Sequence, residues 1–264
     1  MRVTLASWNV NSVRLRLPLI ERLIGEANPD VLCLQETKVE DALFPRERFR
    51  ALGFPHAVIR GQKGYHGVAI LSRLPITEMG GREWAKREDR RHAIACLGGI
   101  EVHNFYVPAG GDVPDPATNP AFAHKLAFLQ EMARWFKKAK GKRPAVLVGD
   151  LNVAPLETDV WSHRQLLKVV SHTPVEVALL KTVQESAAWV DAVRRFVPET
   201  ERLYSWWSYR AHDWARSDRG RRLDHVWVTS SLEPNLRAGG VLKAARGWLR
   251  PSDHAPVLAT FDLP

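Results

Sequence analysis

The chain has 264 residues, of which 45% are hydrophobic and 25% are charged. This composition is typical of a globular protein and excludes a disordered or low-complexity chain. No stretch is apolar for long enough to span a bilayer, and the first residues carry no signal-peptide pattern, so we expect a cytoplasmic location. The net charge of +9 suits a polyanionic partner, and it suits a scattered basic surface equally well.

Two cysteines occur, Cys33 and Cys96, and each lies in an apolar run. Two isolated cysteines exclude a disulfide framework and a thiolate zinc site, and we expect both to be buried as small hydrophobic side chains. No Ser/Gly tract or charge block divides the chain, so the sequence predicts a single domain over residues 1–264.

The predicted elements alternate irregularly along the chain. In order they are a strand at 3–8, a helix at 14–26, strands at 31–35, 67–72 and 93–107, a helix at 120–140, a strand at 145–148, a helix at about 174–186, and strands at 222–229 and 255–261. Gly98-Gly99 predicts a hairpin turn inside the long strand run, and Thr173-Pro174-Val175-Glu176 is a helix capping box. Strands in pairs or with long excursions favour a mixed, largely antiparallel α/β protein.

Five short segments share one property, because each ends an apolar strand with Asp, Glu, Asn or His. They are Ser7–Asn11, Leu34–Lys38, Gly149–Asn152, Arg222–Asp224 and Ser252–His254. Any one of them alone is best interpreted as the start of a turn. Together, their oxygen ligands, amides and imidazole could hold a divalent cation, bind a phosphate and prepare a water molecule.

Three motifs are the most specific: Leu34-Gln35-Glu36-Thr37-Lys38, Gly149-Asp150-Leu151-Asn152-Val153-Ala154-Pro155 and Ser252-Asp253-His254-Ala255-Pro256. In this order and spacing, the chain from Val3 to Phe261 resembles the exonuclease III branch of the endonuclease/exonuclease/phosphatase superfamily. The resemblance implies an α/β fold, a four-layer α/β sandwich in which two packed mixed β-sheets are flanked by helices.

The same resemblance implies a Mg²⁺-dependent DNA-repair phosphodiesterase, with Mn²⁺ as a possible substitute ion. Its expected substrate is double-stranded DNA with abasic sites or 3′ ends, which it would cut on the 5′ side of the abasic site. Expected companion activities are 3′-phosphodiesterase and 3′–5′ exonuclease. The protein would act as a monomer, away from membranes.

The resemblance assigns Glu36 to the metal ion, and a carboxylate suits Mg²⁺. Asn9 and Asn11 match amides near the metal and the phosphate, and Asp253 would support the metal site directly or through water. Asn11 could instead cap the helix that follows it, and the sequence does not decide between these two roles.

The resemblance makes Asp150 the residue that activates the attacking water. Asn152 lies on the same side of an extended segment and could orient Asp150 or donate to a phosphate oxygen. His254 matches the histidine that contacts the scissile phosphate, and Asp224 its carboxylate partner, which raises the proton affinity of the imidazole. Tyr106 matches a tyrosine beside the phosphate, with a buried core tyrosine as the alternative.

The chain departs from the family pattern at Ala109, where relatives usually carry an amide that donates to DNA phosphate. The neighbouring Trp206 and Trp207 face opposite ways in an extended strand, so we expect Trp206 in the wall of a sugar pocket and Trp207 in the core.

Four arginines have open roles in the sequence. Arg221 takes a pocket-wall position where some relatives have an aromatic residue, and it and Arg210 could contact DNA phosphates. Arg219, Arg221 and Arg222 could equally form a solvated basic loop.

Two other functions remain open from the sequence. One is a phosphatase or sphingomyelinase-like enzyme with the same metal site, which the basic charge and the tryptophan pair disfavour. The other is a DNA-binding protein that kept the fold and lost catalysis, which is disfavoured because no catalytic position is substituted.

Overall fold

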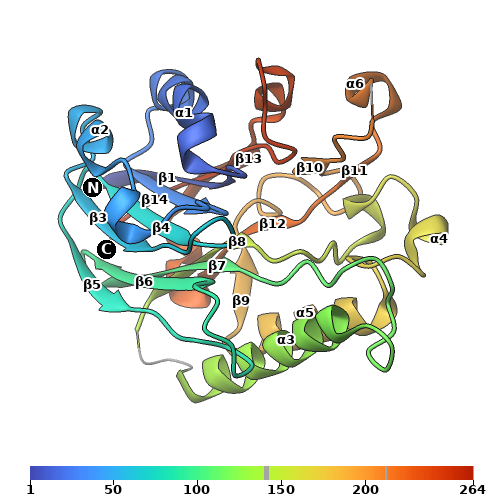
Figure 1. Ribbon diagram of the computed structural model, residues 1–264. Helices are drawn as coiled ribbons and strands as arrows, with labels where there is room; N and C mark the ends of the chain where they lie inside the picture. Colours follow the sequence, from blue (N-terminus) through green and yellow to red (C-terminus); the bar gives the residue numbers. More distant parts are fainter. Residues whose placement is uncertain (140–142, 212, 264) are drawn as a thin grey trace.

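Two six-stranded sheets pack face to face, and helices cover the outer face of each, as Figure 1 shows for this computed structural model. The structure describes residues 1–139, 143–211 and 213–263. The strand orders are β13-β14-β1-β2-β4-β3 and β5-β6-β7-β8-β12-β9, and β10 and β11 form a separate two-stranded ribbon. The predicted four-layer sandwich is therefore confirmed.

The strands of the first sheet are β1 (Arg2–Asn9), β2 (Val31–Gln35), β3 (His56–Arg60), β4 (Val68–Ser72), β13 (Leu236–Val241) and β14 (Val257–Asp262). Those of the second are β5 (Ile76–Gly80), β6 (His92–Leu97), β7 (Ile100–Tyr106), β8 (Ala145–Asp150), β9 (Trp189–Asp191) and β12 (Asp224–Thr229). The ribbon joins β10 (Trp206–Trp207) and β11 (Gly220–Arg221).

The α-helices are α1 (Val13–Ala27), α2 (Arg46–Ala51), α3 (Pro120–Ala139), α4 (His163–Leu166), α5 (Pro174–Ser186) and α6 (Trp214–Ser217). Short 3₁₀ helices span Asp41–Leu43, Glu157–Asp159, Ser230–Asn235 and Lys243–Gly247. The prediction for α3 extended to Lys140, which lies outside the described residues. Among the described residues, every helix is too short or too polar to cross a bilayer.

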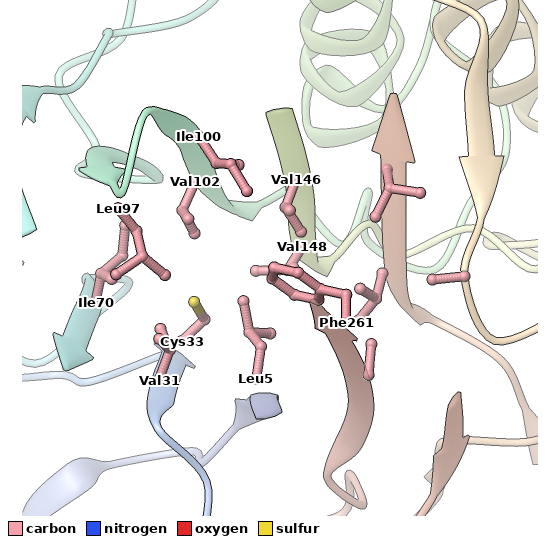
Figure 2. Close-up of a cluster of buried hydrophobic side chains, with 14 of the residues drawn as sticks. Leu5, Val31, Cys33, Ile70, Leu97, Ile100, Val102, Val146, Val148 and Phe261 are labelled. Atoms are coloured by element: carbon pink, nitrogen blue, oxygen red, sulfur yellow. The ribbon is translucent and has the colours of Figure 1, made fainter. Parts of the chain in front are cut away.

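The main core lies between the two sheets (Figure 2). Leu5, Cys33 and Ile70 project from the first sheet, and Val102 and Val148 from the second. Because side chains alternate across a strand, the opposite faces of the same strands build two further apolar layers, one under α1 and α2 and one under α3 and α5. Cys33 is buried as expected, and Cys96 is only partly so.

Strand pairing brings the polar strand ends together at one end of the sandwich. Antiparallel β12 begins where β8 ends, so Asp224 pairs with Asp150, and parallel β7 places Tyr106 beside Asp150 as well. At the other sheet, antiparallel β14 begins beside the end of β1. Both chain termini lie at the left of Figure 1, whereas β10, β11, α4 and α6 lie at the right, beyond the ends of β8 and β12.

His225, on β12, is a buried histidine that the fold holds neutral. Its Nε2 contacts the carbonyl oxygen of Val153 at 2.9 Å, and Nδ1 is buried with no hydrogen-bond partner among the described residues. Burial lowers the pKa of His225 to about 4, and the Arg222 guanidinium adds to this effect. Burial likewise lowers the pKa values of His92 and His103, whose rings contact each other at 3.3 Å.

We expect the protein to lose thermal stability as the pH falls below about 6.5, the ordinary histidine pKa. In that range the unfolded chain binds protons that the folded chain cannot accept at His225, so stability is complete above pH 6.5 and declines toward pH 4. Melting curves between pH 7.5 and 4.5 test this. A His225→Gln variant, which keeps a donor for Val153, should show a shallower decline; an unchanged decline would contradict the assignment to His225.

Candidate active site

Asn9 links two carboxylates at the floor of the site. Its Nδ2 donates to Asp150 Oδ2 at 2.9 Å and to Glu36 Oε1 at 2.8 Å, while its Oδ1 accepts from the backbone N–H of Asn11 at 3.1 Å. The amide nitrogen of Asn9 therefore faces the carboxylates, and its oxygen faces the backbone. Asn9 is fully buried at the end of β1, so this orientation is fixed by the fold.

His254 and Asp224 form a buried pair. The imidazole Nδ1 donates to Asp224 Oδ2 at 2.8 Å, and Ser205 Oγ donates to the same oxygen at 2.6 Å. The other ring nitrogen, Nε2, lies 3.7 Å from Asp150 Oδ2. Burial opposes protonation of His254, but Asp224 and Asp150 outweigh it and raise its pKa to about 10. The site therefore presents an imidazolium, a donor suited to an anionic phosphate.

Asp150 is buried at the end of β8, with 1% of its surface exposed. Burial raises the pKa of Asp150 to about 7; protonated His254 opposes this shift, whereas nearby Asp224 and Glu36 add to it. A carboxylate that titrates near neutral pH is suited to take a proton from water.

The backbone around Asp150 needs unusual conformations. Asn152 has a φ of 55°, in the left-handed region, which turns its backbone N–H toward Asp150 Oδ1 at 3.0 Å. Its side-chain Nδ2 donates to the carbonyl oxygen of Val107 at 2.9 Å. Gly149 has a φ of 134°, and a Cβ there would lie 1.9 Å from the Phe105 carbonyl oxygen, so glycine is required.

Tyr106 lies at the end of β7. It packs in the core between the sheets and also lines the cavity above Asp150. The Arg91 guanidinium lies over its ring at 4.7 Å. Burial raises the pKa of Tyr106 well above its ordinary value, so its hydroxyl keeps its proton at neutral pH.

The site is suited to a divalent cation. Among the described residues, carboxylate oxygens of Asp150 and Asp224 lie within 4.8 Å of each other and of a ring nitrogen of His254, which is protonated and therefore donates rather than binds a cation. Asp224 Oδ1 is buried and accepts no hydrogen bond from any described group. Three carboxylates, with Glu36 beside Asp150, crowd one site, and a cation would relieve their repulsion.

Glu36 is ionised at this site. Burial would raise its pKa, but hydrogen bonds from Lys38 and Asn9 lower it below its ordinary value. Lys38 Nζ lies 2.8 Å from Glu36 Oε2, so the second carboxylate oxygen is held by a residue from the same motif.

A cavity of about 680 Å³ opens above these groups. Glu36, Tyr106, Asp150, Asn152, Asp253 and His254 contribute polar lining, and Trp161, Val169, Val170, Trp206 and Leu223 contribute apolar lining. Trp206 Nε1 donates to Asp253 Oδ2 at 3.0 Å, which fixes the indole. Arg210, Arg219 and Arg221 line the same cavity.

Two arginine–tryptophan contacts border the apolar part. The guanidinium of Arg221 lies 5.2 Å from the centre of the Trp206 ring, and that of Arg219 lies 4.7 Å from the Trp161 ring. Trp207, the neighbour of Trp206, is 1% exposed and belongs to the core.

The structure also corrects parts of the sequence interpretation. Asn11 does not cap α1, because Ser12 is the N-cap and accepts from the backbone N–H of Leu15. Arg222 is not part of a solvated loop; it is 3% exposed and paired with buried carboxylates. The sequence around His163 and His172 predicts a solvated surface segment, but His172 is buried against the carbonyl oxygen of Ala154.

Several residues around the site had no role in the sequence interpretation. They are Lys38, Lys125, Trp161, Ser171 and Ser205. Lys38 lies inside a recognised motif, so its pairing with Glu36 could have been anticipated. The others reach the site from distant helices and loops, and no local pattern marks them.

Comparison with known proteins identifies the family of this chain. The profile of the Endonuclease/Exonuclease/phosphatase family matches residues 6–254. The exodeoxyribonuclease III of Haemophilus influenzae is 30% identical over 97% of this chain and 98% of its own. An AP endonuclease structure from Archaeoglobus fulgidus is 33% identical with a TM-score of 0.91, covering 98% of this chain and 99% of that one. A 3′ phosphatase from Neisseria, solved bound to a product DNA hairpin, is 29% identical with a TM-score of 0.89 and the same coverage.

The fold, the carboxylate–histidine site and the family match together define the class: the chain belongs to the endonuclease/exonuclease/phosphatase family. Within that family it is a DNA-repair nuclease of the exonuclease III/AP endonuclease type, a hydrolase that acts on DNA. The family is metal-dependent, which suits the carboxylate-rich site described above.

Proposed function

We propose that this protein is a Mg²⁺-dependent phosphodiesterase that hydrolyses the backbone 5′ to abasic sites in duplex DNA. It would leave a 3′-hydroxyl and a 5′-deoxyribose phosphate, and it would also remove 3′-blocking groups and digest duplex DNA from 3′ ends. The observation that supports this most directly is the buried Asp150–His254–Asp224 group at the floor of a cavity walled by indole rings.

Asp150 would take a proton from the attacking water, which forms a bond to phosphorus as the bond to the 3′-oxygen breaks. The leaving 3′-oxygen gains a proton and becomes the hydroxyl product. His254, held by Asp224, would donate to a non-bridging phosphate oxygen as negative charge builds there. Tyr106 lines the same cavity with its hydroxyl protonated, and it would stabilise the phosphate or assist the leaving oxygen.

Asn152 would donate to a phosphate oxygen through the second N–H of Nδ2, since the first N–H donates to the carbonyl oxygen of Val107. Glu36 and Asp253 would hold the Mg²⁺ ion, or Mn²⁺ in its place, and the ion would neutralise charge that develops on the phosphate. Asn9, whose nitrogen bridges the carboxylates, would keep Glu36 and Asp150 in place beside it.

The apolar part of the cavity would receive the abasic sugar. Trp206 forms a rigid wall there, and an intact nucleotide carries a base that this wall would exclude. A base-free unit also costs less to extrude from the duplex, which favours damaged positions. Arg221 and Arg210, which line the cavity, would contact DNA phosphates. Asn11, whose Oδ1 accepts from Lys38 Nζ, would bind substrate.

One experiment tests the reaction. A duplex labelled at one 5′ end and carrying an internal abasic analogue is incubated with Mg²⁺ or with EDTA. Incision gives one product whose length stops at the lesion, whereas digestion from the 3′ end gives a ladder. We expect the lesion-length product with Mg²⁺ and neither product with EDTA. A wild-type enzyme that yields no lesion-length product would reject the abasic specificity.

The rival phosphatase function makes a different prediction. An enzyme that contacts several DNA phosphates loses affinity steeply as the salt concentration rises, because bound counterions are released on association. A small-substrate phosphatase of the same family would show only a weak salt dependence. A Kd for the abasic duplex that rises many-fold between 50 and 200 mM salt, on the order of the loss known for DNA-binding proteins, would favour the DNA enzyme.

A further inference from the structure

Lys125 is a fully buried lysine in the middle of α3, behind the cavity. All three of its ammonium protons have acceptors: the carbonyl oxygen of Asn152 at 2.7 Å, that of Ala109 at 3.2 Å, and Glu176 Oε1 at 2.5 Å. Its aliphatic stem also packs closely against the loop after β7. A Cβ atom added to Gly110 in that loop would lie only 2.9 Å from Lys125 Cδ. One side chain therefore joins two segments that line the catalytic cavity.

Glu176 extends the connection to a third segment. It is the capping-box residue of α5, and Oε2 accepts from Thr173 Oγ1 at 2.6 Å. The same carboxylate accepts from the backbone N–H of Ser171, with both oxygens at 2.9 Å. Ser171 follows Val169 and Val170 in the wall of the cavity. A residue that the sequence marks only as a helix cap thus also holds the cavity wall.

The wall in turn holds the arginine beside Trp206. Arg221 donates to Ser171 Oγ at 2.8 Å and to the carbonyl oxygen of Val170 at 3.0 Å. A continuous set of hydrogen bonds therefore runs from Asn152, at the phosphate end of the cavity, through the buried ion pair to Arg221, at the sugar end.

Folding stability alone does not account for this ion pair. Both side chains are fully buried, and removing two charges from water costs about as much as their attraction returns, so an apolar pair would serve a helix–helix contact at least as well. What an apolar pair cannot supply is the set of directed hydrogen bonds to Asn152, Ala109 and Ser171.

We propose that Lys125 and Glu176 are a positioning pair that sets the distance between the phosphate-binding segment at Asn152 and the cavity wall at Ser171. The inference rests on the catalytic roles proposed above. Neither residue lines the cavity: Lys125 acts through the backbone of Asn152 and Glu176 through the backbone of Ser171, and both of those residues line it. Misplacement of such groups by about 1 Å can cost about 100-fold in rate.

Three variants test the pair. Lys125→Met keeps the stem and removes the donors. The double variant Lys125→Met/Glu176→Gln leaves no unpaired buried charge, so we expect it to recover much of the melting temperature that Lys125→Met alone loses. Glu176→Asp keeps both charges, but its side chain is one methylene too short to reach Lys125 and Ser171 together. This variant can still test the pair if the other two variants do not fold.

The readouts are melting temperature, kcat and KM, measured on the abasic duplex and on undamaged duplex digested from its 3′ ends. We expect the double variant and Glu176→Asp to lower kcat at least about 10-fold at wild-type-like stability, with a smaller change in KM. The matched control, Lys181→Met on the exposed face of α5, removes an ion pair to Glu185 with a separation of 3.8 Å and should leave all three values unchanged.

Two results would contradict a positioning role for Lys125 and Glu176. One is a double variant that regains both stability and wild-type kcat, which would make the pair purely structural. The other is a Glu176→Asp variant with unchanged kcat. Failure of the proposed function can be told apart from failure of the positioning role, because it shows in the wild-type enzyme. The wild type would then digest DNA from 3′ ends without incising the abasic duplex. In that case the variants are compared on 3′ digestion.

Discussion

Replacing Asp150 with Asn is expected to lower kcat for DNA hydrolysis by about 100- to 10,000-fold, the range for loss of a general base. The change is isosteric, so the hydrogen bond from Asn9 Nδ2 to the Oδ2 position can persist with the amide oxygen. What disappears is the group that takes the proton from water. Steady-state kinetics on the abasic duplex with saturating Mg²⁺ measure the effect.

The same substitution should not cost stability. Burial and the neighbouring carboxylates raise the pKa of Asp150 to about 7, well above the ordinary value for an aspartate. The folded protein therefore holds a proton there that the unfolded chain releases at neutral pH, so Asp150 opposes folding at pH 7. We expect the melting temperature of Asp150→Asn to equal or exceed that of the wild type, a trade of stability for activity.

The control is Glu88→Gln, an isosteric loss of charge at an exposed position outside the cavity. It should change neither kcat nor melting temperature. An Asp150→Asn variant that hydrolyses DNA at the wild-type rate would rule out Asp150 as the base and would leave the imidazole of His254 to be tested next.

The sequence predicts the central part of the fold well for a physical reason. The strands β2 and β8, which end at Gln35 before Glu36 and at Asp150, are fully buried apolar runs that stop at polar residues, a pattern visible locally, whereas Asp224 begins β12 and does not end a strand as the sequence predicted. The capping box at Thr173 likewise marks the start of α5 where the structure has it. Such elements are specified by neighbours in the chain.

The sequence missed β3, β5 and β13 as well as the shortest strands, and these shortest strands depend on distant partners. β10 and β11 have two residues each and β9 has three, too few for any alternation to be readable. Their positions follow from tertiary pairing, such as the register of Trp206 with Arg221. Since those two residues border the cavity, the end that they line was harder to predict than the end at Asp150.

The burial of charged side chains was the property hardest to predict from the sequence. Arg219, Arg221 and Arg222 form a run that looks solvated. Arg219 is exposed and lies over Trp161, whereas Arg221 is partly buried in the cavity wall and Arg222 is buried. Burial of Arg222 requires carboxylates from two other segments, Asp159 and Asp191, and no local pattern predicts that they meet.

The second large effect is expected from that buried cluster. Arg222 contacts Asp159 through Nε at 2.8 Å and a second nitrogen at 3.1 Å, and it contacts Asp191 Oδ2 at 2.6 Å. Arg194 also donates to Asp159 Oδ1, at 2.6 Å. Although burial raises the pKa of Asp191, the nearby Arg222 charge lowers it below its ordinary value, so both charges persist in the folded state.

Arg222→Met should lower the free energy of unfolding by about 3–5 kcal/mol, because it leaves Asp191 without its guanidinium partner and Asp159 with Arg194 alone. Urea denaturation at pH 7 measures this. The control, Arg237→Met, removes a partly exposed pair with Asp262 at 2.7 Å and should cost less than about 1 kcal/mol.

Two further variants separate the causes of that loss. If uncompensated charge is responsible, adding Asp191→Asn to Arg222→Met should return part of the lost stability, since Asp159 keeps Arg194 while Asp191 loses its guanidinium partner. If loss of packing around the long arginine stem is responsible, the double variant should be no more stable than Arg222→Met. An Arg222→Met protein as stable as the Arg237→Met control would show instead that the cluster contributes no net stability, and that its carboxylates are accommodated by water or protons once the arginine is gone.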